Sequence, residues 1–107
     1  MIFKYGETKK IELGGGVSRK ILAHNEKLMA VEVSFEKGSV GALHKHEHEQ
    51  ISYVLKGKFK VTIGGKENIL KVGDTYYTAP DEEHGVVALE EGVLLDIFTP
   101  ERKDFLK

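Results

Sequence analysis

The chain has 107 residues, 40% of them hydrophobic and 31% charged, which suits one folded domain over residues 1–107 with one core. The 16 basic and 17 acidic residues are well mixed, so nucleic acid is not an expected partner. No apolar run approaches the roughly 20 residues of a membrane span. The chain has no cysteine, which excludes disulfides, thiolate nucleophiles and sulfur-ligated metals. The N-terminus lacks the apolar stretch of a secretion signal, so we expect a cytoplasmic protein with no membrane partner.

Glycine punctuates the chain, and most segments between glycines are short and alternate apolar with polar residues. The run of glycines at 14–16 separates an N-terminal strand from the rest. The segment 28–35 places Met29, Val31, Val33 and Phe35 on one face of a strand. Further strands are predicted at 51–55, 59–63, 75–78, 85–89 and 93–99, with a hairpin turn at Gly64-Gly65.

Helical periodicity is confined to the tail at 100–106, where a short helical turn is possible. Many short strands with glycine turns every 8–12 residues indicate an all-β sandwich or barrel.

Four of the five histidines fall in two short segments. Residues two apart on a strand point to the same side, so we expect His44 and His46 to face one ion together. A turn over 47–49 lets the next strand bring Gln50 in beside them. His84 starts a later strand and supplies a fourth ligand from across the barrel. The joint spacing in a β pattern predicts a divalent metal site.

Each of these residues also has a plainer interpretation. A lone His-x-His pair is usually a surface accident, His84 alone is more often a loop histidine, and Gln50 alone is more often an exposed polar residue. On alternation, His48 and Glu49 compete with Gln50 for the site, although His48 fits better in the turn. His24 fits a turn or the surface.

The two segments resemble the two motifs of the cupin family. The first motif has a glycine, five residues, His-x-His, a further ligand and a closing glycine, and the matching residues are Gly38, His44, His46, Gln50 and Gly57. In the second motif the matches are Gly73 and His84. Gln50 stands where most cupins carry Glu, and Ala79, Asp81 and Ala88 depart from the pattern at turn positions. The resemblance implies a single-domain double-stranded β-helix, the jelly-roll barrel.

Three histidines and a glutamine are all neutral ligands, so the bound metal keeps its full charge. This argues against an iron dioxygenase, which commonly uses two histidines and a carboxylate, and favours a Lewis acid. Nitrogen-rich ligation suits Zn²⁺, Ni²⁺, Co²⁺ or Fe²⁺, and the sequence does not choose among them.

From about 13 to 106 the chain resembles one cupin subfamily, the pectin-degradation KdgF proteins. The resembling stretches include 16–25, 35–38, 46–50, 84–86 and 92–106. The resemblance implies a protein that opens 4,5-unsaturated uronates to linear keto sugar acids. It implies metal ligands at His44, His46, Gln50 and His84, and reaction residues at Asp96, Phe98 and Arg102.

The residue types allow these roles and also allow structural ones. Alternation along 94–98 places Asp96 and Phe98 on one face, and a partly buried carboxylate has a raised pKa that suits acid–base work. Arg102 offers a fork for the uronate carboxylate. Alternatively, Asp96 pairs with Arg19, Lys20 or Arg102, Phe98 is core, and Arg102 lies on a solvated helix face.

Four functions are open at this point. They are ring opening of an unsaturated uronate, an iron-dependent oxygenase, a non-catalytic sugar-binding module, and a metal-dependent isomerase of another sugar. Small barrels of this kind often pair through edge strands, so we also expect a homodimer with 1–13 as the exchanged or interface segment.

Overall fold

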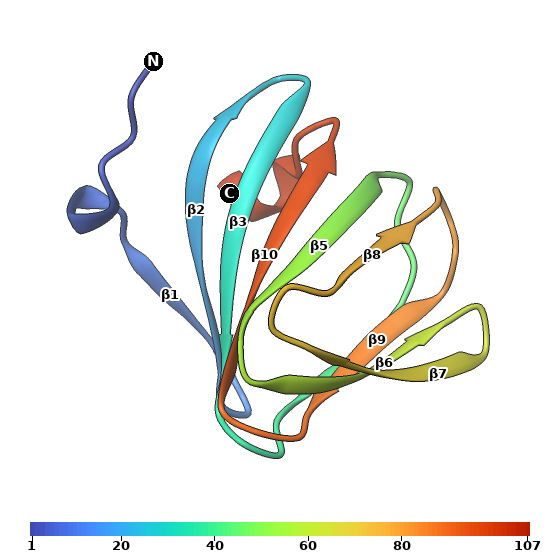
Figure 1. Cartoon of the computed structure of the whole chain (residues 1–107). Coiled ribbons are helices and arrows are strands. Elements are labelled where there is room, and N and C mark those ends of the chain that lie inside the picture. The colour runs from blue at the N-terminus through green and yellow to red at the C-terminus, as the bar shows by residue number, and fades with distance from the viewer.

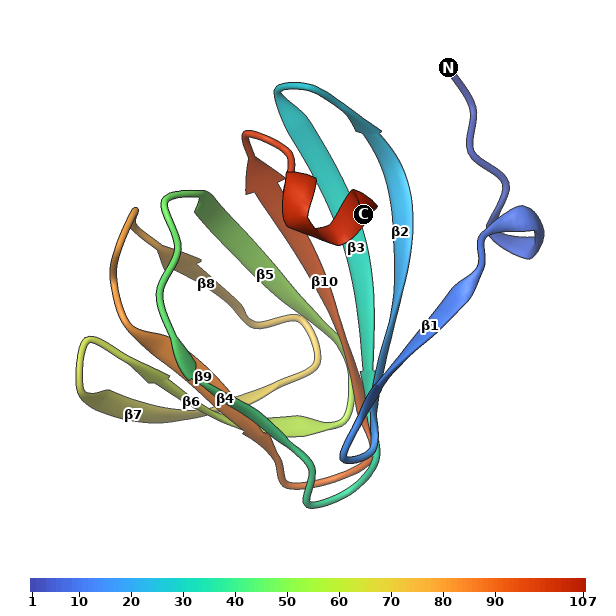
Figure 2. The same cartoon turned by 180° about the vertical axis from the view of Figure 1, so that it is seen from behind.

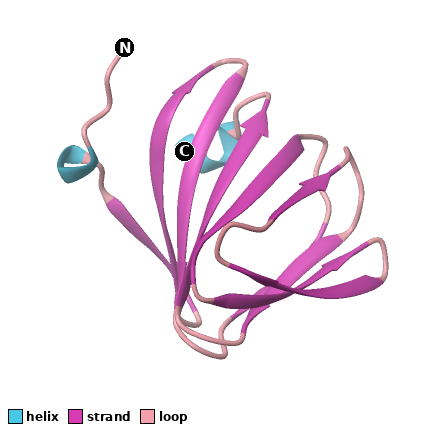
Figure 3. Ribbon diagram, in the orientation of Figure 1, coloured by secondary structure: helices cyan, strands magenta, loops and turns pink.

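The computed structural model describes all 107 residues and contains ten β-strands in two antiparallel sheets, with two short 3-10 helices (Figures 1 and 3). The larger sheet has the order β1 (Lys10–Gly14), β2 (Val17–Asn25), β3 (Leu28–Phe35), β10 (Gly92–Thr99), β5 (Glu49–Lys56) and β8 (Thr75–Thr78). The smaller sheet has the order β4 (Val40–His44), β9 (His84–Ala88), β6 (Lys58–Ile63) and β7 (Lys66–Lys71). The 3-10 helices are η1 (Tyr5–Glu7) and η2 (Lys103–Leu106).

The all-β prediction is confirmed, and the predicted C-terminal helical turn is η2. The predicted strands 28–35 and 75–78 have the observed bounds, and the others differ by one or two residues at their ends. No helix in the structure is long and apolar enough to cross a membrane.

The two sheets meet at one end and open at the other (Figure 1). A cluster built around Phe35 and Phe59, whose rings pack edge to face at 5.2 Å, occupies the space between the sheets. Met29, Val31 and Phe98 form a smaller cluster, and Phe105 of η2 packs against it. As alternation predicts, every second residue of β10 points into this interior, and Leu94, Asp96 and Phe98 are buried.

The C-terminal segment folds back over the larger sheet, where η2 lies across β3 and β10 (Figure 2). His24 holds it there, because its Nδ1 lies 2.9 Å from Oε2 of the buried Glu101. The Glu101 backbone N–H also donates to Glu26 O at 3.2 Å. The expectation that His24 lies in a turn or on the surface is therefore wrong: it is half-buried on β2. Its partner lies 77 residues away, which no local pattern reveals.

At the other end of the chain, the N-terminal segment projects away from the barrel and leads into β1 at the edge of the larger sheet (Figure 1). The homodimer and the exchange of residues 1–13 stay predictions.

Gly57 links β5 to β6 with a φ of 82°, and a Cβ there would lie 2.4 Å from Glu91 O. Gly38 has a similar φ of 84° but open space around it. We expect Gly38→Ala to lower the free energy of unfolding by about 1–2 kcal/mol through backbone strain alone. Gly57→Ala should cost about 1–3 kcal/mol more, because the β9–β10 turn must also move. Urea unfolding of both variants measures the difference, and equal losses would contradict this account of Gly57.

Candidate functional site

Three histidines converge at the open end of the barrel. The ligand atoms of His44, His46 and His84 all lie within 4.8 Å of one another. His44 is the last residue of β4 and His84 the first of β9, and the two are direct neighbours in the antiparallel register. This cluster could hold one metal ion, and His48 is not part of it.

Two details of the predicted geometry are wrong. His46 does not share a strand with His44, because β4 ends at His44. A loop presents His46 instead, and the Asp81 backbone N–H fixes that loop by donating to His46 O at 2.7 Å. His84 also comes from the strand beside His44 rather than from across the barrel. Gln50 is the residue that reaches in from the opposite sheet.

Asp81 replaces a glycine of the cupin motif and still adopts the glycine-like conformation, with a φ of 61°. Aspartate tolerates this region better than most residues. The departure at Asp81 therefore leaves the turn, and the support it gives to His46, intact.

Backbone carbonyls fix the tautomer of each histidine in the cluster. The Nδ1 atoms of His44, His46 and His84 each lie 2.9 Å from a carbonyl oxygen, those of Ala42, His48 and Glu82 respectively. An Nδ1–H that donates to a carbonyl leaves the Nε2 lone pair free to ligate. Burial lowers the pKa of His46, and lowers that of His84 to about 4, so both rings stay neutral near pH 7.

Gln50 completes a set of lone pairs that point at one another. Its Oε1 lies 3.0 Å from His46 Nε2, while its Nε2 donates to Ser52 Oγ at 2.8 Å. The Ser52 hydroxyl in turn donates to Asp96 Oδ1 at 2.6 Å. With the His46 proton on Nδ1, neither atom of the 3.0 Å contact carries a hydrogen. Two acceptors at that distance repel unless a cation lies between their lone pairs.

The buried Nε2 of His84 has no hydrogen-bond partner within the protein, which fits a nitrogen that ligates a cation. Nitrogen from three imidazoles and oxygen from one amide form a donor set that suits a divalent transition metal. The residues present therefore fit a resident metal ion.

Asp96 lies at the far end of this chain of hydrogen bonds. Burial raises its pKa to about 6, while the Ser52 hydrogen bond and the positive charge of Arg102 hold it below the value that burial alone would give. Tyr76 lines the same cavity, and burial together with the Asp96 charge raises the pKa of its hydroxyl. The cavity thus holds a single buried carboxyl group that titrates near neutral pH.

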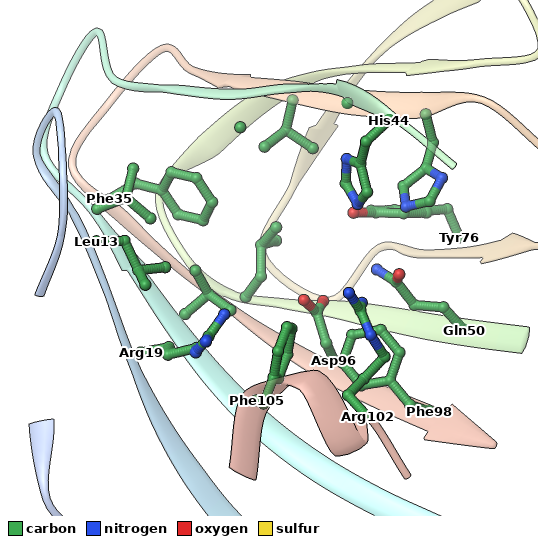
Figure 4. A pocket seen from close by; sticks show the side chains of 17 residues that line it. Leu13, Arg19, Phe35, His44, Gln50, Tyr76, Asp96, Phe98, Arg102 and Phe105 are labelled. Carbon is green, nitrogen blue, oxygen red and sulfur yellow. The ribbon is translucent and has the colours of Figure 1, made fainter. Parts of the chain in front are cut away.

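The cavity between the sheets has a volume of about 240 Å³ (Figure 4). His44, Gln50, His84 and Asp96 line its polar part, and Phe98, Arg102 and Phe105 line it next to η2. Phe98 is both core and wall, since it is buried against Met29 and Val31 and its ring lies 5.7 Å from that of His46.

Arg102 does not lie on a solvated helix face. Its guanidinium packs over the rings of Phe98 and Phe105, at 5.1 and 4.2 Å from their centroids. Its Nε and Nη2 donate to the two carboxylate oxygens of Asp104 at 3.1 and 2.9 Å.

Sequence reasoning assigned no role to Arg19, Tyr76 and Phe105, which line this cavity, or to Ser52, which hydrogen-bonds to Asp96. The signal for Ser52 was present, because it is two residues after Gln50 on one strand and shares its inward face. The signal for Arg19 was present too, since it follows Val17 with the same spacing on β2. Because Tyr76 and Tyr77 are adjacent on β8, only one of them can face the cavity, and Tyr77 is the exposed one.

Comparison with known proteins agrees with this fold and places the chain in a family. Residues 31–98 match the family model of the cupin domain, so the chain belongs to the cupin family. Within it, the chain is 53% identical over 102 residues to the pectin degradation protein KdgF of Dickeya dadantii, covering 94% of this chain and 93% of that protein. The chain is a KdgF homologue.

Solved structures give the same result. KdgF from Halomonas sp. superposes with a TM-score of 0.93 at 40% identity, covering 98% of this chain and 97% of that one. An RmlC-like cupin from Shewanella frigidimarina superposes with a TM-score of 0.94 at 39% identity, covering 97% and 94%.

We expect the protein to bind Zn²⁺ or Ni²⁺ with a stoichiometry of one. His84→Ala should abolish this binding, and Ser52→Ala should weaken it about 10- to 100-fold, because the Gln50 amide loses the partner that orients it. Competition with a chelating dye at pH 7 measures the affinities. Ser34→Ala, on the outward side of β3, is the control. Unchanged affinity in a folded Ser52→Ala variant would show that the hydrogen-bond chain does not orient a ligand.

The raised pKa of Asp96 predicts that the free energy of unfolding of the metal-free protein depends on pH. Between its ordinary pKa of 3.8 and about 6, folded Asp96 keeps a proton that the unfolded chain has released. Stability from this group is therefore lost as the pH rises through that window, by about 3 kcal/mol in total. Asp96→Asn removes the loss, so its free energy of unfolding relative to wild type should rise by about that amount from pH 4 to pH 7. Exposed Glu83→Gln is the control, and a pH-independent difference for Asp96→Asn would contradict the shift.

Proposed function

We propose that this protein is a metal-dependent enzyme that opens 4,5-unsaturated uronates to linear keto sugar acids. The observation that carries the proposal is the hydrogen-bond chain from Gln50 through Ser52 to Asp96. It joins a buried carboxyl group to a cluster of three histidines, of which His44 and His84 line the same cavity as Asp96. The homology to pectin degradation proteins supports the substrate class.

In this proposal His44, His46, Gln50 and His84 hold the metal. When bound, the ion supplies Lewis acidity that lowers the pKa of a substrate oxygen. The four ligands are neutral and do not compensate the charge of the ion, which suits this role better than redox chemistry.

Asp96 moves the proton. The unsaturated uronate is a cyclic hemiacetal whose ring oxygen is attached to a carbon–carbon double bond. Ionised Asp96 takes the proton of the anomeric hydroxyl, the bond from the anomeric carbon to the ring oxygen breaks, and an aldehyde and an enolate form. Protonated Asp96 then returns that one proton to the enolate carbon, and the enolate oxygen becomes the oxygen of a ketone. The reaction is a net isomerisation that needs no oxidant, and a pKa of about 6 makes both forms of Asp96 accessible.

The aromatic residues surround this chemistry. Phe98 and Phe105 pack edge to face at 5.8 Å and give the cavity an apolar wall against which a sugar ring can lie. Arg102 places a positive charge close to Asp96, and that charge lowers the pKa of the carboxyl group against the effect of burial. In the proposal these three residues position the substrate and keep Asp96 poised between its two forms.

The test uses the unsaturated monomer that a pectate lyase releases from polygalacturonate. We expect metal-loaded protein to accelerate the loss of the ultraviolet absorbance of the conjugated double bond above the spontaneous rate. Asp96→Asn keeps a side-chain oxygen that can accept from Ser52, so metal binding should persist. Its kcat should fall by about 10²- to 10⁴-fold, because general acid–base catalysis contributes that much. Chelator should abolish the acceleration, and Glu83→Gln should leave it unchanged. No acceleration with pectin- or alginate-derived uronates by folded, metal-loaded protein would refute the proposal.

A further inference from the structure

Arg19 is an inward-facing arginine in the wall of the cavity. It follows Val17 on β2, so the alternation that buries Val17 also turns Arg19 toward the interior. It lines the same cavity as His84 and Asp96, and its side chain extends toward Phe105 (Figure 4). Its strand neighbour in the register is Val33, which packs against the core.

The Arg19 guanidinium has no anionic partner. None of the ion pairs in the structure includes it, and its buried Nε has no hydrogen-bond partner. Its carbon lies 3.6 Å from the centroid of the Phe105 ring, so one planar face is covered while the edge that carries the donors is not satisfied. Burial and the nearby charge of Arg102 lower its pKa, and the charge of Asp104, which forms no ion pair with Arg19, only partly offsets them. A partly buried guanidinium with unused donors is costly unless a ligand satisfies it.

The second arginine of the cavity differs in this respect. Arg102 already uses its Nε and Nη2 in a two-bond contact with Asp104. Both guanidinium groups lie against the ring of Phe105, so the charges are close together and make this part of the cavity cationic. The edge that matches a planar carboxylate with two parallel hydrogen bonds is free on Arg19 and occupied on Arg102.

We propose that Arg19 binds the carboxylate of the substrate and makes the cavity selective for acid sugars. The inference rests on the proposed function for its substrate class. The carboxylate lies between Arg19 and the cationic edge of Arg102, and the sugar ring extends over Phe98 and Phe105 toward Asp96 and the histidines. Arg19 is then the residue that determines specificity, and Arg102 supplies charge from its contact with Asp104.

The test compares D-galacturonate with its methyl ester, which keeps the same ring and lacks the charge. Calorimetric titration of metal-loaded wild type should show tighter binding of the acid than of the ester, by at least about tenfold. Arg19→Met keeps an unbranched side chain against Phe105 and should remove that preference. Arg19→Lys should restore part of it, because the charge returns without the fork. Lys20→Gln changes the neighbouring residue, which packs on Tyr5, and is the matched control.

Turnover of the unsaturated uronate gives a second, independent readout. In Arg19→Met we expect KM to rise about tenfold while kcat changes much less, as for a group that binds substrate and transition state alike. A purely structural role against Phe105 would lower the melting temperature and leave the preference for the acid over the ester intact.

The outcomes separate the two proposals. Equal affinity of wild type for acid and ester, including no measurable binding of either, overturns the role of Arg19, as does an Arg19→Met variant that keeps the preference. A preference that depends on Arg19 in a protein that does not consume unsaturated uronates sustains the carboxylate site and refutes the ring-opening function. If the protein consumes unsaturated uronates and Arg19→Met leaves KM unchanged, the ring-opening function is sustained and the carboxylate site at Arg19 is refuted.

Discussion

The hydrogen-bond chain from Asp96 through Ser52 to Gln50 is the interaction on which the site depends. An amide can present either its oxygen or its nitrogen to a histidine, and nothing in Gln50 itself decides between them. The buried carboxyl group of Asp96 decides, because it draws the Ser52 hydroxyl proton and leaves the Ser52 oxygen to accept from the amide. The Gln50 oxygen must then face His46, and a hydrogen-bond acceptor at one end of the chain fixes the orientation of the Gln50 amide at the other.

The sequence predicted the parts of this arrangement that follow from strand periodicity. Asp96 and Phe98 lie on β10, a strand that is paired on both sides, so whether a position is odd or even along the strand decides which face its side chain points to. The position of His46 depends instead on a backbone hydrogen bond from Asp81, in a loop 35 residues later. Motif spacing identified His46 correctly, but strand alternation gave the wrong local structure for it. Contacts between loops have no period that a single sequence displays.

The C-terminal segment was hardest to predict for a related reason. Residues 100–106 read as a charged helical tail, yet Arg102 and Phe105 form a wall of the cavity. They do so because buried Glu101 pairs with His24 and ties the segment to the turn between β2 and β3. Charged residues on a short helix are usually solvated. Only the long-range partner, invisible in the local pattern, turns this one inward.

The cavity has a neutral polar region at the histidines and a positively charged region beside η2. Around the histidines the ligands are neutral and their tautomers are fixed by backbone carbonyls, so positive charge there comes only with an ion. Beside η2 the positive charge is permanent, because two guanidinium groups lie against one phenylalanine ring and only one of them has a carboxylate partner. A neutral ligand would leave that second charge partly desolvated and unpaired, whereas a bound carboxylate compensates it. In the two proposals taken together, the same fold therefore orients a substrate by its charge at one end and acts on its hydroxyl groups at the other.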